Sequence, residues 1–443
     1  MVETVHEILS NVNMNNIRLK VRNFGPIKNG YEQDDGFLTI PKVTLFCGPQ
    51  GSGKSTITKL LSSLMWLEKA AYVIAWNRSE FVVSDPSVIV SLMDWHGISS
   101  YFQPETEIVY KGDLIDLHYN NGILRLTPSV NSGGTYEKPR IMYMPAERNF
   151  LHYFKNSAPV EQPPLLILHK EYSKAEKIYA SGFDLPINGY RFALNAEHKP
   201  VILNLHATGT PSETPLSASS SGIQSILPIL LVSEYLQSRI GADSPGTDMD
   251  SMSLTRNPFL TFANTDATPC FRDSDTKVNV PTFVFRANRA ASCFTNVVEE
   301  PEQNLFPPTQ RNVLRRLLSI CGLAESNRLI LSTHSPYIVS DLIASTIAKK
   351  LYDLADMAGT KSAECRKLVE EIYSPYAVVD SSQVCLFETN YDGVIRKSMD
   401  DQGRLSDKNF LNYHLQLSSK LFDHMLSLRA HIENVVAESA AHE

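Results

Sequence analysis

The stretch VTLFCGPQGSGKST, residues 43–56, decides the fold of this chain. It begins with a continuous apolar run, Val43–Cys47, which is typical of a strand buried on both faces. Directly after it, apolar residues recur at helical spacing and predict a helix over residues 55–70. The stretch therefore predicts a strand, a glycine-rich turn and a helix, the repeating unit of an α/β fold.

The turn itself, GPQGSGKST at residues 48–56, satisfies the pattern GxxxxGK[ST]. Glycines allow backbone N–H groups to surround a triphosphate, the lysine reaches its β- and γ-phosphates, and the hydroxyl binds Mg²⁺. A chance match in a glycine-rich turn is the alternative, and the position between a buried strand and a helix argues against it. We predict an ATP or GTP site with Mg²⁺, formed by Gly48, Pro49, Gln50, Gly51, Ser52, Gly53, Lys54, Ser55 and Thr56.

Two carboxylates end a second predicted strand, at residues 294–298, in the sequence VVEEP. One carboxylate at such a strand end can bind Mg²⁺ or its water shell, and the other can polarise an attacking water. We assign Glu299, together with Ser55, to the metal and Glu300 to the catalytic base. A solvated acidic turn is the alternative interpretation.

A third apolar strand, at residues 329–332, leads to His334 in the sequence LILSTHSP. A histidine at this place can donate a hydrogen bond to a γ-phosphate oxygen. Since a lone histidine after a strand is more often structural, the prediction depends on the carboxylate strand that precedes it. Lys54, Glu300 and His334 are the predicted catalytic residues.

Five segments now occur in a specific order: LKVRNFGPI, GPQGSGKST, SSSGIQSILPILL, EEPEQNLFP and STHSPYIV. In this order they resemble the ABC-type ATPase heads of the RecF, SMC and OLD nuclease group. The sequence is most similar to the small stand-alone AAA ATPases of bacterial anti-phage systems, such as the Septu ATPase PtuA. The resemblance extends from residue 17 to about residue 342.

The resemblance implies an α/β fold of the P-loop, ABC-type head class, with a mixed sheet flanked by helices. It further implies an inserted, mainly helical signature lobe and a C-terminal helical tail. We expect four parts: 1–150 with the phosphate loop, 151–278 with the signature and a polar loop, 279–400 with the carboxylates and His334, and 401–443 as a helical segment.

The segment 220–224, SSGIQ, matches the family's signature. The resemblance implies that Ser221 and Gly222 contact the γ-phosphate held by a second copy, in a head-to-tail homodimer or a higher homo-oligomer. A helix predicted from residue 223 would direct its positive end at that phosphate. Without the resemblance, a serine run is usually a flexible linker. Arg148, in YMPAER, either approaches the nucleotide or its lid or forms a structural ion pair, and both interpretations stay open.

Composition limits the other functions. The formal net charge is −7, so any nucleic-acid surface must be a local patch. Basic residues gather in the sequence at Arg311, Arg315, Arg316, Lys349 and Lys350, where a solvated helix face is favoured over DNA contact. The six cysteines form no CxxC pair, and no secretory signal or membrane-length apolar run is present, so we expect a cytoplasmic protein without membrane contact.

No constellation of acidic or histidine residues typical of a nuclease follows His334, so we expect any nuclease to be a separate chain, such as an HNH protein. The leading hypothesis is an ATPase that dimerises around Mg·ATP and regulates this effector in anti-phage defence. A nucleotide-sensing scaffold that restrains a toxin and a RecF-like DNA-repair ATPase are the alternatives. Residues 241–277 read as an exposed polar insertion. Residues 409–436 read as an amphipathic helix that either packs internally or docks a partner.

Overall fold

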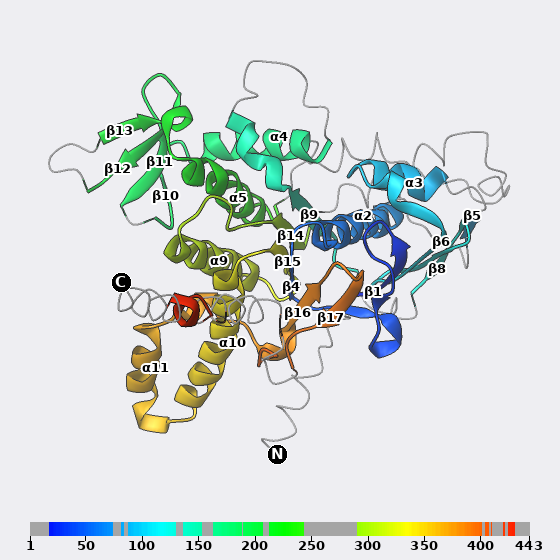
Figure 1. The fold of residues 1–443 in the computed structure, drawn as a ribbon. Coiled ribbons are helices and arrows are strands. Elements are labelled where there is room, and N and C mark those ends of the chain that lie inside the picture. Colours follow the sequence, from blue (N-terminus) through cyan, green and yellow to red (C-terminus); the bar gives the residue numbers. More distant parts are fainter. Residues whose placement is uncertain are drawn as a thin grey trace, which may run out of the picture.

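The computed structural model describes residues 17–73, 81–83, 87–129, 136–152, 163–187, 189–206, 212–242 and 290–400, with 404–406, 409, 420 and 424–429. At its centre lies a seven-stranded sheet (Figure 1). Its order is β2 (Gly30–Tyr31), β17 (Val394–Lys397), β16 (Val384–Thr389), β4 (Val43–Cys47), β15 (Arg328–Thr333), β14 (Cys293–Glu299) and β9 (Pro139–Met144). The strands from β16 to β9 are parallel, so their carboxyl ends meet at one edge of the sheet.

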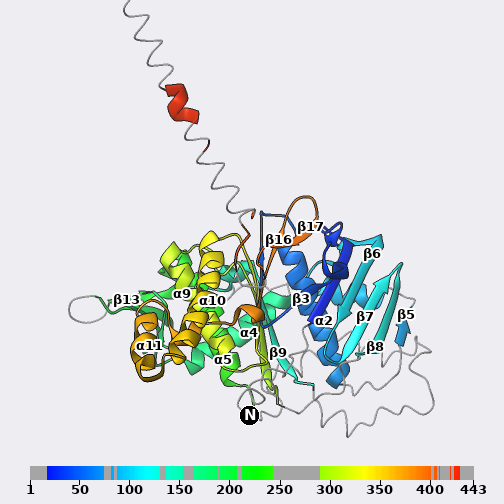
Figure 2. The same cartoon turned by 90° about the horizontal axis from the view of Figure 1, so that it is seen from below.

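Helices cover both faces of this sheet (Figures 1 and 2). On one face lies α2 (Lys54–Val73), and on the other lie α4 (Pro163–Ile178), α5 (Ser221–Ser238), α9 (Pro307–Gly322) and α10 (Pro336–Asp356). Alternate residues of β4 pack into the hydrophobic cores on the two faces of the sheet. Leu45 packs among the second group of helices, and Phe46 packs on the α2 side. Both faces are buried, which is why β4 is apolar throughout.

A second, antiparallel sheet packs on the outer side of α2. Its order is β3 (Leu38–Ile40), β1 (Ile17–Phe24), β6 (Phe102–Lys111), β7 (Ile115–Asn120), β8 (Ile123–Pro128) and β5 (Phe81–Val83). The short helix α3 (Ser87–Asp94) lies beside it. The turn after β1 reaches the phosphate loop, because Pro26 and Ile27 pack against Gly53.

The segment between β9 and β14 contains more than the predicted helices. Besides α4 and α5 it holds a four-stranded antiparallel sheet, β10 (Phe183–Asp184), β11 (Tyr190–Leu194), β12 (Pro200–Asn204) and β13 (Ser212–Pro215). These strands have two to five residues, and prolines flank or begin several of them. Such short segments have no clear period-2 pattern, which explains why the sequence did not predict them.

The predicted α/β fold class is confirmed: the chain has a mixed sheet flanked by helices, and the phosphate loop joins β4 to α2. The predicted strands 43–47, 294–298 and 329–332 and the helix 55–70 all occur, extended by zero to three residues at an end. The helix predicted from residue 223 also occurs and begins two residues earlier. Helix α11 (Ser362–Glu370), which packs on α10, was not predicted.

Some predictions fall mostly outside the described residues. These are the insertion 241–277, of which only residues 241 and 242 are described, and most of the amphipathic helix 409–436. Within that helix, residues 424–429 are helical and exposed. The four-part division of the chain stays a prediction.

Candidate functional site

The phosphate loop begins with a glycine that no other residue could replace without strain. Gly48 has φ +142°, and a Cβ atom there would lie 2.2 Å from the carbonyl oxygen of Thr389. Gly53 has φ +103°, and its Cβ would lie 2.4 Å from Cδ1 of Ile27. The Ser52 hydroxyl lies 2.6 Å from Oγ1 of Thr389 and donates to the Pro49 carbonyl at 2.7 Å. The loop is therefore held against the end of β16, a contact that the sequence did not predict.

Lys54 is a buried cation at the start of α2, with 5% of its surface exposed. Its ammonium donates to the carbonyls of Gly48 at 2.9 Å and Pro49 at 2.7 Å, and lies 3.4 Å from Nδ1 of His334. Burial lowers the pKa of Lys54 to about 8. No described carboxylate lies within ion-pair distance of this ammonium, so the loop holds a cation whose charge is not directly neutralised.

Glu300 and His334 lie beside Lys54. Nε2 of His334 is 3.3 Å from Oε1 of Glu300, so the ring joins the lysine on one side and the carboxylate on the other. This arrangement suits the neutral tautomer with the proton on Nε2, because Nδ1 faces an ammonium donor. The hydrogen bond from His334 lowers the pKa of Glu300. The three predicted catalytic residues are thus brought together at the carboxyl ends of β4, β14 and β15.

Glu299, the predicted metal ligand, is the last residue of β14 and is 3% exposed. Its carboxylate accepts long hydrogen bonds from the Thr58 hydroxyl and the Ala146 backbone N–H, both at 3.4 Å. Burial and the neighbouring Glu299 raise the pKa of Tyr143 well above its usual range. Thr58 and Ala146 have no catalytic sequence signature, so only the structure shows them at this carboxylate.

Glu302 lies in the segment EEPEQNLFP, two residues after Glu300. Its Oε1 accepts from the backbone N–H of His334 at 2.7 Å, while Oε2 is buried and has no hydrogen-bond partner. Burial raises the pKa of this carboxyl group. Glu302 therefore holds the His334 segment and leaves one buried polar atom facing the site.

The signature residues lie at the start of α5. Ser221 is exposed, and the side chain of Ser220 caps the helix by accepting from the Ile223 backbone N–H at 3.4 Å. Gly222 packs so closely on the loop after the carboxylates that a Cβ would lie 2.7 Å from the Asn304 carbonyl oxygen. Within one chain, Gly222 therefore lies against Asn304 and Leu305 rather than among the hydrogen bonds of the phosphate loop.

The contacts of Arg148 differ from a structural ion pair, one of the two interpretations of the sequence, while its approach to a nucleotide or lid stays a prediction. The guanidinium donates to backbone carbonyls, including those of Glu299 and Glu300, both at 2.6 Å, instead of forming a direct ion pair. It also reaches Ser225 of α5. Arg148 therefore links the signature helix to the carboxylate pair.

The donor set fits Mg²⁺ bound together with a triphosphate. Among the described residues, no group of three or more His, Cys, Asp or Glu side chains could hold a metal. Mg²⁺ in nucleotide sites is usually held by one or two protein oxygens plus phosphates and waters, and Ser55 and Glu299 supply a hydroxyl and a carboxylate at one edge of the sheet. The unneutralised Lys54 ammonium and the unpartnered Glu302 Oε2 indicate that this edge is built for charged groups.

The predicted basic cluster does not form a free cationic surface. Arg315 pairs with Asp341 at 2.7 Å, Arg316 pairs with Glu234, and Lys349 pairs with Asp353 at 2.5 Å. Arg311 lies over the ring of Tyr337. Paired side chains favour the solvated-face interpretation over DNA contact.

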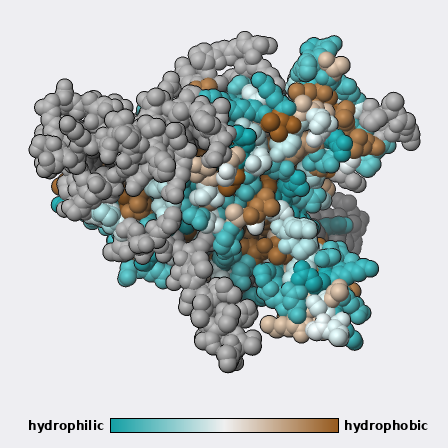
Figure 3. Space-filling view, turned by 180° about the vertical axis from the view of Figure 1, so that it is seen from behind, coloured by the Kyte–Doolittle hydropathy of each residue, from teal (hydrophilic) through white to brown (hydrophobic). Residues whose placement is uncertain are grey.

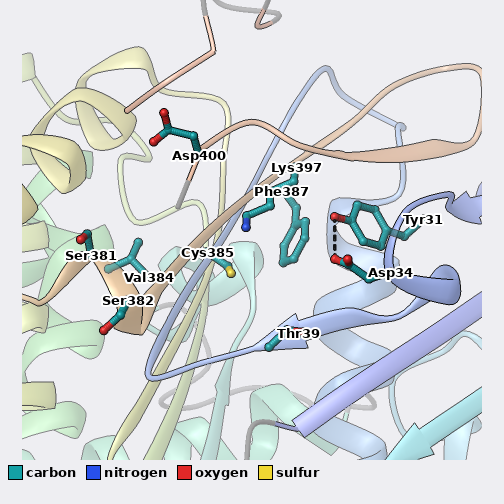
Figure 4. A pocket seen from close by; sticks show the side chains of 10 residues that line it. All are labelled: Tyr31, Asp34, Thr39, Ser381, Ser382, Val384, Cys385, Phe387, Lys397 and Asp400. Atoms are coloured by element: carbon teal, nitrogen blue, oxygen red, sulfur yellow. Dashed lines mark hydrogen bonds between the residues drawn. The ribbon is translucent and has the colours of Figure 1, made fainter. Parts of the chain in front are cut away.

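A separate hollow of about 310 Å³ lies near the start of β16 (Figure 4). Tyr31 and Asp34, joined by a hydrogen bond of 3.3 Å, face Ser381 and Ser382 across it. The phosphate loop contacts Thr389 at the other end of the same strand. This hollow is therefore distinct from the predicted nucleotide site.

No helix in the described part of the chain is long and apolar enough to cross a membrane. On the face shown in Figure 3, hydrophobic residues form separate groups among hydrophilic ones.

No protein-family model matches the chain, and no curated protein matches it. Many solved structures are similar to the chain, and they include the following three. An SMC head domain from Thermotoga maritima is 10% identical, with 74% of this chain and 92% of that chain covered and a TM-score of 0.32. An Smc head domain bound to the C-terminal domain of ScpA, derived from Pyrococcus furiosus, is 10% identical, with 73% and 90% covered and a TM-score of 0.30. A dimeric ATP-binding cassette in a post-hydrolysis state with ADP and Pi is 12% identical, with 73% and 89% covered and a TM-score of 0.21.

Similarities this distant assign no activity and no partner to this chain. Its fold class follows from the strand order, and its chemistry has to be inferred from the contacts at the sheet edge.

Proposed function

We propose that this chain binds Mg·ATP and hydrolyses it to ADP and phosphate. The observation that carries the proposal is the chain of contacts from Lys54 through His334 to Glu300, built around a buried ammonium that forms no ion pair with a described carboxylate. Such a cation needs an anion of matching size, and the backbone of a glycine-rich loop at a helix N-terminus is suited to a triphosphate.

Each residue has a separate role in this proposal. Lys54 would leave the Gly48 and Pro49 carbonyls and donate to the β- and γ-phosphates. Glu300, charged at neutral pH, would accept a proton from the attacking water. The Nε2–H of His334, which is directed at Glu300 here, would donate to the γ-phosphate once a nucleotide is bound. Ser55 and Glu299 would hold Mg²⁺, which neutralises charge on the phosphates.

We further propose that hydrolysis requires two copies of the chain. Ser221 is exposed at the capped N-terminus of α5, where backbone N–H groups and the helix dipole favour an anion. In the proposed head-to-tail dimer this end faces the γ-phosphate on the second copy, as the resemblance to ABC-type heads implies.

The proposed cellular role is regulation of a separate effector nuclease in cytoplasmic anti-phage defence. It rests on the resemblance to AAA ATPases of such systems and on the described residues, which contain no group of metal-binding side chains that could cut a phosphodiester. Incubation of the isolated protein with plasmid, single-stranded DNA and RNA, in Mg²⁺ or Mn²⁺, should show no cleavage. Cleavage that survives Glu300→Gln would contradict a separate effector.

A nucleotide-sensing scaffold is the second candidate, and one observation favours it. The Glu299 carboxylate is bonded to Thr58 and Ala146, so it has to exchange these bonds for a metal or its waters. If that exchange is unfavourable, ATP is bound and scarcely hydrolysed.

Steady-state phosphate release with purified wild type and Glu300→Gln separates the two functions. An ATPase gives release that depends on Mg²⁺ and falls to background in Glu300→Gln, while both proteins bind ATP in calorimetry. Binding in both proteins with equal background release would support the scaffold instead.

A further inference from the structure

Arg148 lies in the short helix η3 (Ala146–His152), directly after β9, and is fully enclosed with 0% of its surface exposed. Burying a guanidinium is costly unless its N–H groups are hydrogen-bonded. Burial lowers the pKa of Arg148 to about 10, so it stays charged at neutral pH. The burial of this charged guanidinium indicates that the hydrogen bonds of Arg148 have a role in addition to packing.

The guanidinium connects three segments of the chain. Nη1 donates to the carbonyls of Glu299 at 2.6 Å and Pro145 at 3.1 Å, and Nη2 donates to the carbonyl of Glu300 at 2.6 Å. Nε donates to the carbonyl of Ser225 in α5 at 3.1 Å, and Nη2 lies 3.4 Å from the Ser225 hydroxyl. The planar guanidinium can serve these acceptors at once, whereas the single ammonium of a lysine cannot.

The carbonyl of Glu300 belongs to a strained residue. Glu300 has φ +43°, in the left-handed region, which costs a residue with a side chain on the order of 1 kcal/mol or more. Its backbone N–H donates to the Ser332 carbonyl at 2.8 Å, and Arg148 holds its carbonyl. These two bonds fix the peptide planes on either side of the residue, and therefore the direction of the carboxylate.

A second contact joins the same helix to the same loop. The Ser225 hydroxyl donates to Oε1 of Gln303 at 3.4 Å, and Gly222 packs on the Asn304 carbonyl. The start of α5 is therefore tied to both sides of Glu300. A displacement of α5 would move the backbone that carries the carboxylate.

We propose that Arg148 is a positioning residue for hydrolysis, which holds the Glu299–Glu300 backbone against α5 so that the carboxylate geometry depends on the position of that helix. The inference rests on the proposed function, because α5 is the element proposed to face the nucleotide of the second copy. Arg148 then relays engagement of that nucleotide to Glu300 of its own site. It contacts neither nucleotide in this scheme, so it acts on kcat and not on affinity.

The test is Arg148→Lys, which keeps the charge and loses the multiple bonds. We expect kcat for ATP to fall about 10- to 100-fold, because a misplacement of about 1 Å has effects of that size, while ATP affinity per folded molecule changes less than about twofold. Arg315→Lys is the matched control, since Arg315 pairs with Asp341 away from the site. It should lower the melting temperature and leave kcat and the Hill coefficient of hydrolysis unchanged.

The outcomes are distinguishable. If the wild type hydrolyses ATP and Arg148→Lys retains kcat within about threefold, the inference is overturned and the proposed function stands. If kcat and the fraction of protein that binds ATP fall in equal proportion in Arg148→Lys, Arg148 has a structural role only. That outcome also overturns the inference. If the wild type shows no hydrolysis above Glu300→Gln, the proposed function fails and the inference fails with it.

A second variant keeps the test usable if Arg148→Lys does not fold. Ser225→Ala removes the hydroxyl that contacts both Arg148 and Gln303 and introduces no larger group. We expect kcat to fall about threefold with unchanged ATP affinity. An unchanged kcat in a folded Ser225→Ala protein would overturn the inference.

Discussion

Two acidic side chains, Glu300 and Glu68, lie in regions that differ in solvent exposure and shift the pKa of the carboxyl group in opposite directions. Glu300 directly follows β14 at the open edge of the sheet, with its side chain 32% exposed, and its pKa is lowered by the hydrogen bond from His334. Glu68, on α2, is 2% exposed, and burial raises its pKa from 4.5 to about 7. It accepts from the Tyr110 hydroxyl at 2.7 Å and the Leu114 backbone N–H at 2.6 Å.

The contrast shows how one residue type serves two purposes. Partial exposure and a histidine keep Glu300 charged and able to accept a proton. Enclosure against the β6–β7 turn makes Glu68 a connection between α2 and the antiparallel sheet, and a Cβ at Gly112 would lie only 2.2 Å from its Oε1. The same substitution, Glu to Gln, should therefore affect activity in one region and stability in the other.

Glu300→Gln should have the largest effect on turnover. The amide keeps the shape and loses the ability to accept a proton, so kcat should fall by at least about 100-fold. ATP binding and the melting temperature should change little, which calorimetry and thermal denaturation can check. A variant that still releases phosphate at the wild-type rate would remove Glu300 from the role of base.

Lys54→Ala should have the next largest effect, because it removes the cation of the same region. Loss of a charge-assisted contact to phosphate is expected to weaken ATP binding by about 10- to 100-fold. Calorimetric titration measures this change, with Lys349→Ala as a control at a cation paired with Asp353 on the surface. Equal ATP affinity in Lys54→Ala and the wild type would contradict the assignment of the site.

Glu68→Gln tests the enclosed region. Because its pKa is raised in the folded state, the folded protein binds more protons than the unfolded chain between pH 4.5 and about 7. The contribution of Glu68 to stability is therefore lost as pH rises through that window. Denaturant unfolding at pH 5 and pH 8 should show the wild type losing about 1 to 3 kcal/mol relative to Glu68→Gln.

Glu68→Gln also tests whether the enclosed carboxylate takes part in turnover. Per folded molecule, its kcat should equal that of the wild type. A pH-independent stability difference between the two proteins would show that Glu68 does not titrate as its burial implies.

The smallest expected effect is the pH dependence of ATP binding. The pKa of Lys54 is lowered to about 8, so its charge is lost as pH rises through that value. ATP affinity should fall by about three- to tenfold from pH 7 to pH 9. Lys54→Arg should show a flat profile over the same range, because a guanidinium stays charged. A wild-type profile as flat as that of Lys54→Arg would contradict the lowered pKa.

The elements that carry the site were largely predictable. Apolar runs bounded by turn residues predicted β4, β14 and β15, and helical spacing predicted α2 and α5. Strands β16 and β17 were missed, although β16 is the neighbour of β4 in the sheet and carries Thr389 against the loop. A single threonine after a short apolar run has no chemical signature, so nothing in the sequence distinguished it.

By itself, the sequence determined which chemical groups this protein has and where each occurs relative to a strand end. A phosphate loop is a local motif, because its glycines, lysine and hydroxyl lie within nine residues. Glu299, Glu300 and His334 could be predicted because each lies at the end of an apolar run in the sequence.

Only the tertiary structure decided which of these groups meet. Lys54 and His334 are 280 residues apart and come together because β4 and β15 are neighbouring parallel strands that end at one edge. Strand order depends on packing across the whole molecule and not on local pattern. Arg148 is the clearest case: the sequence left open whether it approached a nucleotide or formed an ion pair, and only the structure shows it among the backbone carbonyls of Glu299, Glu300 and Ser225.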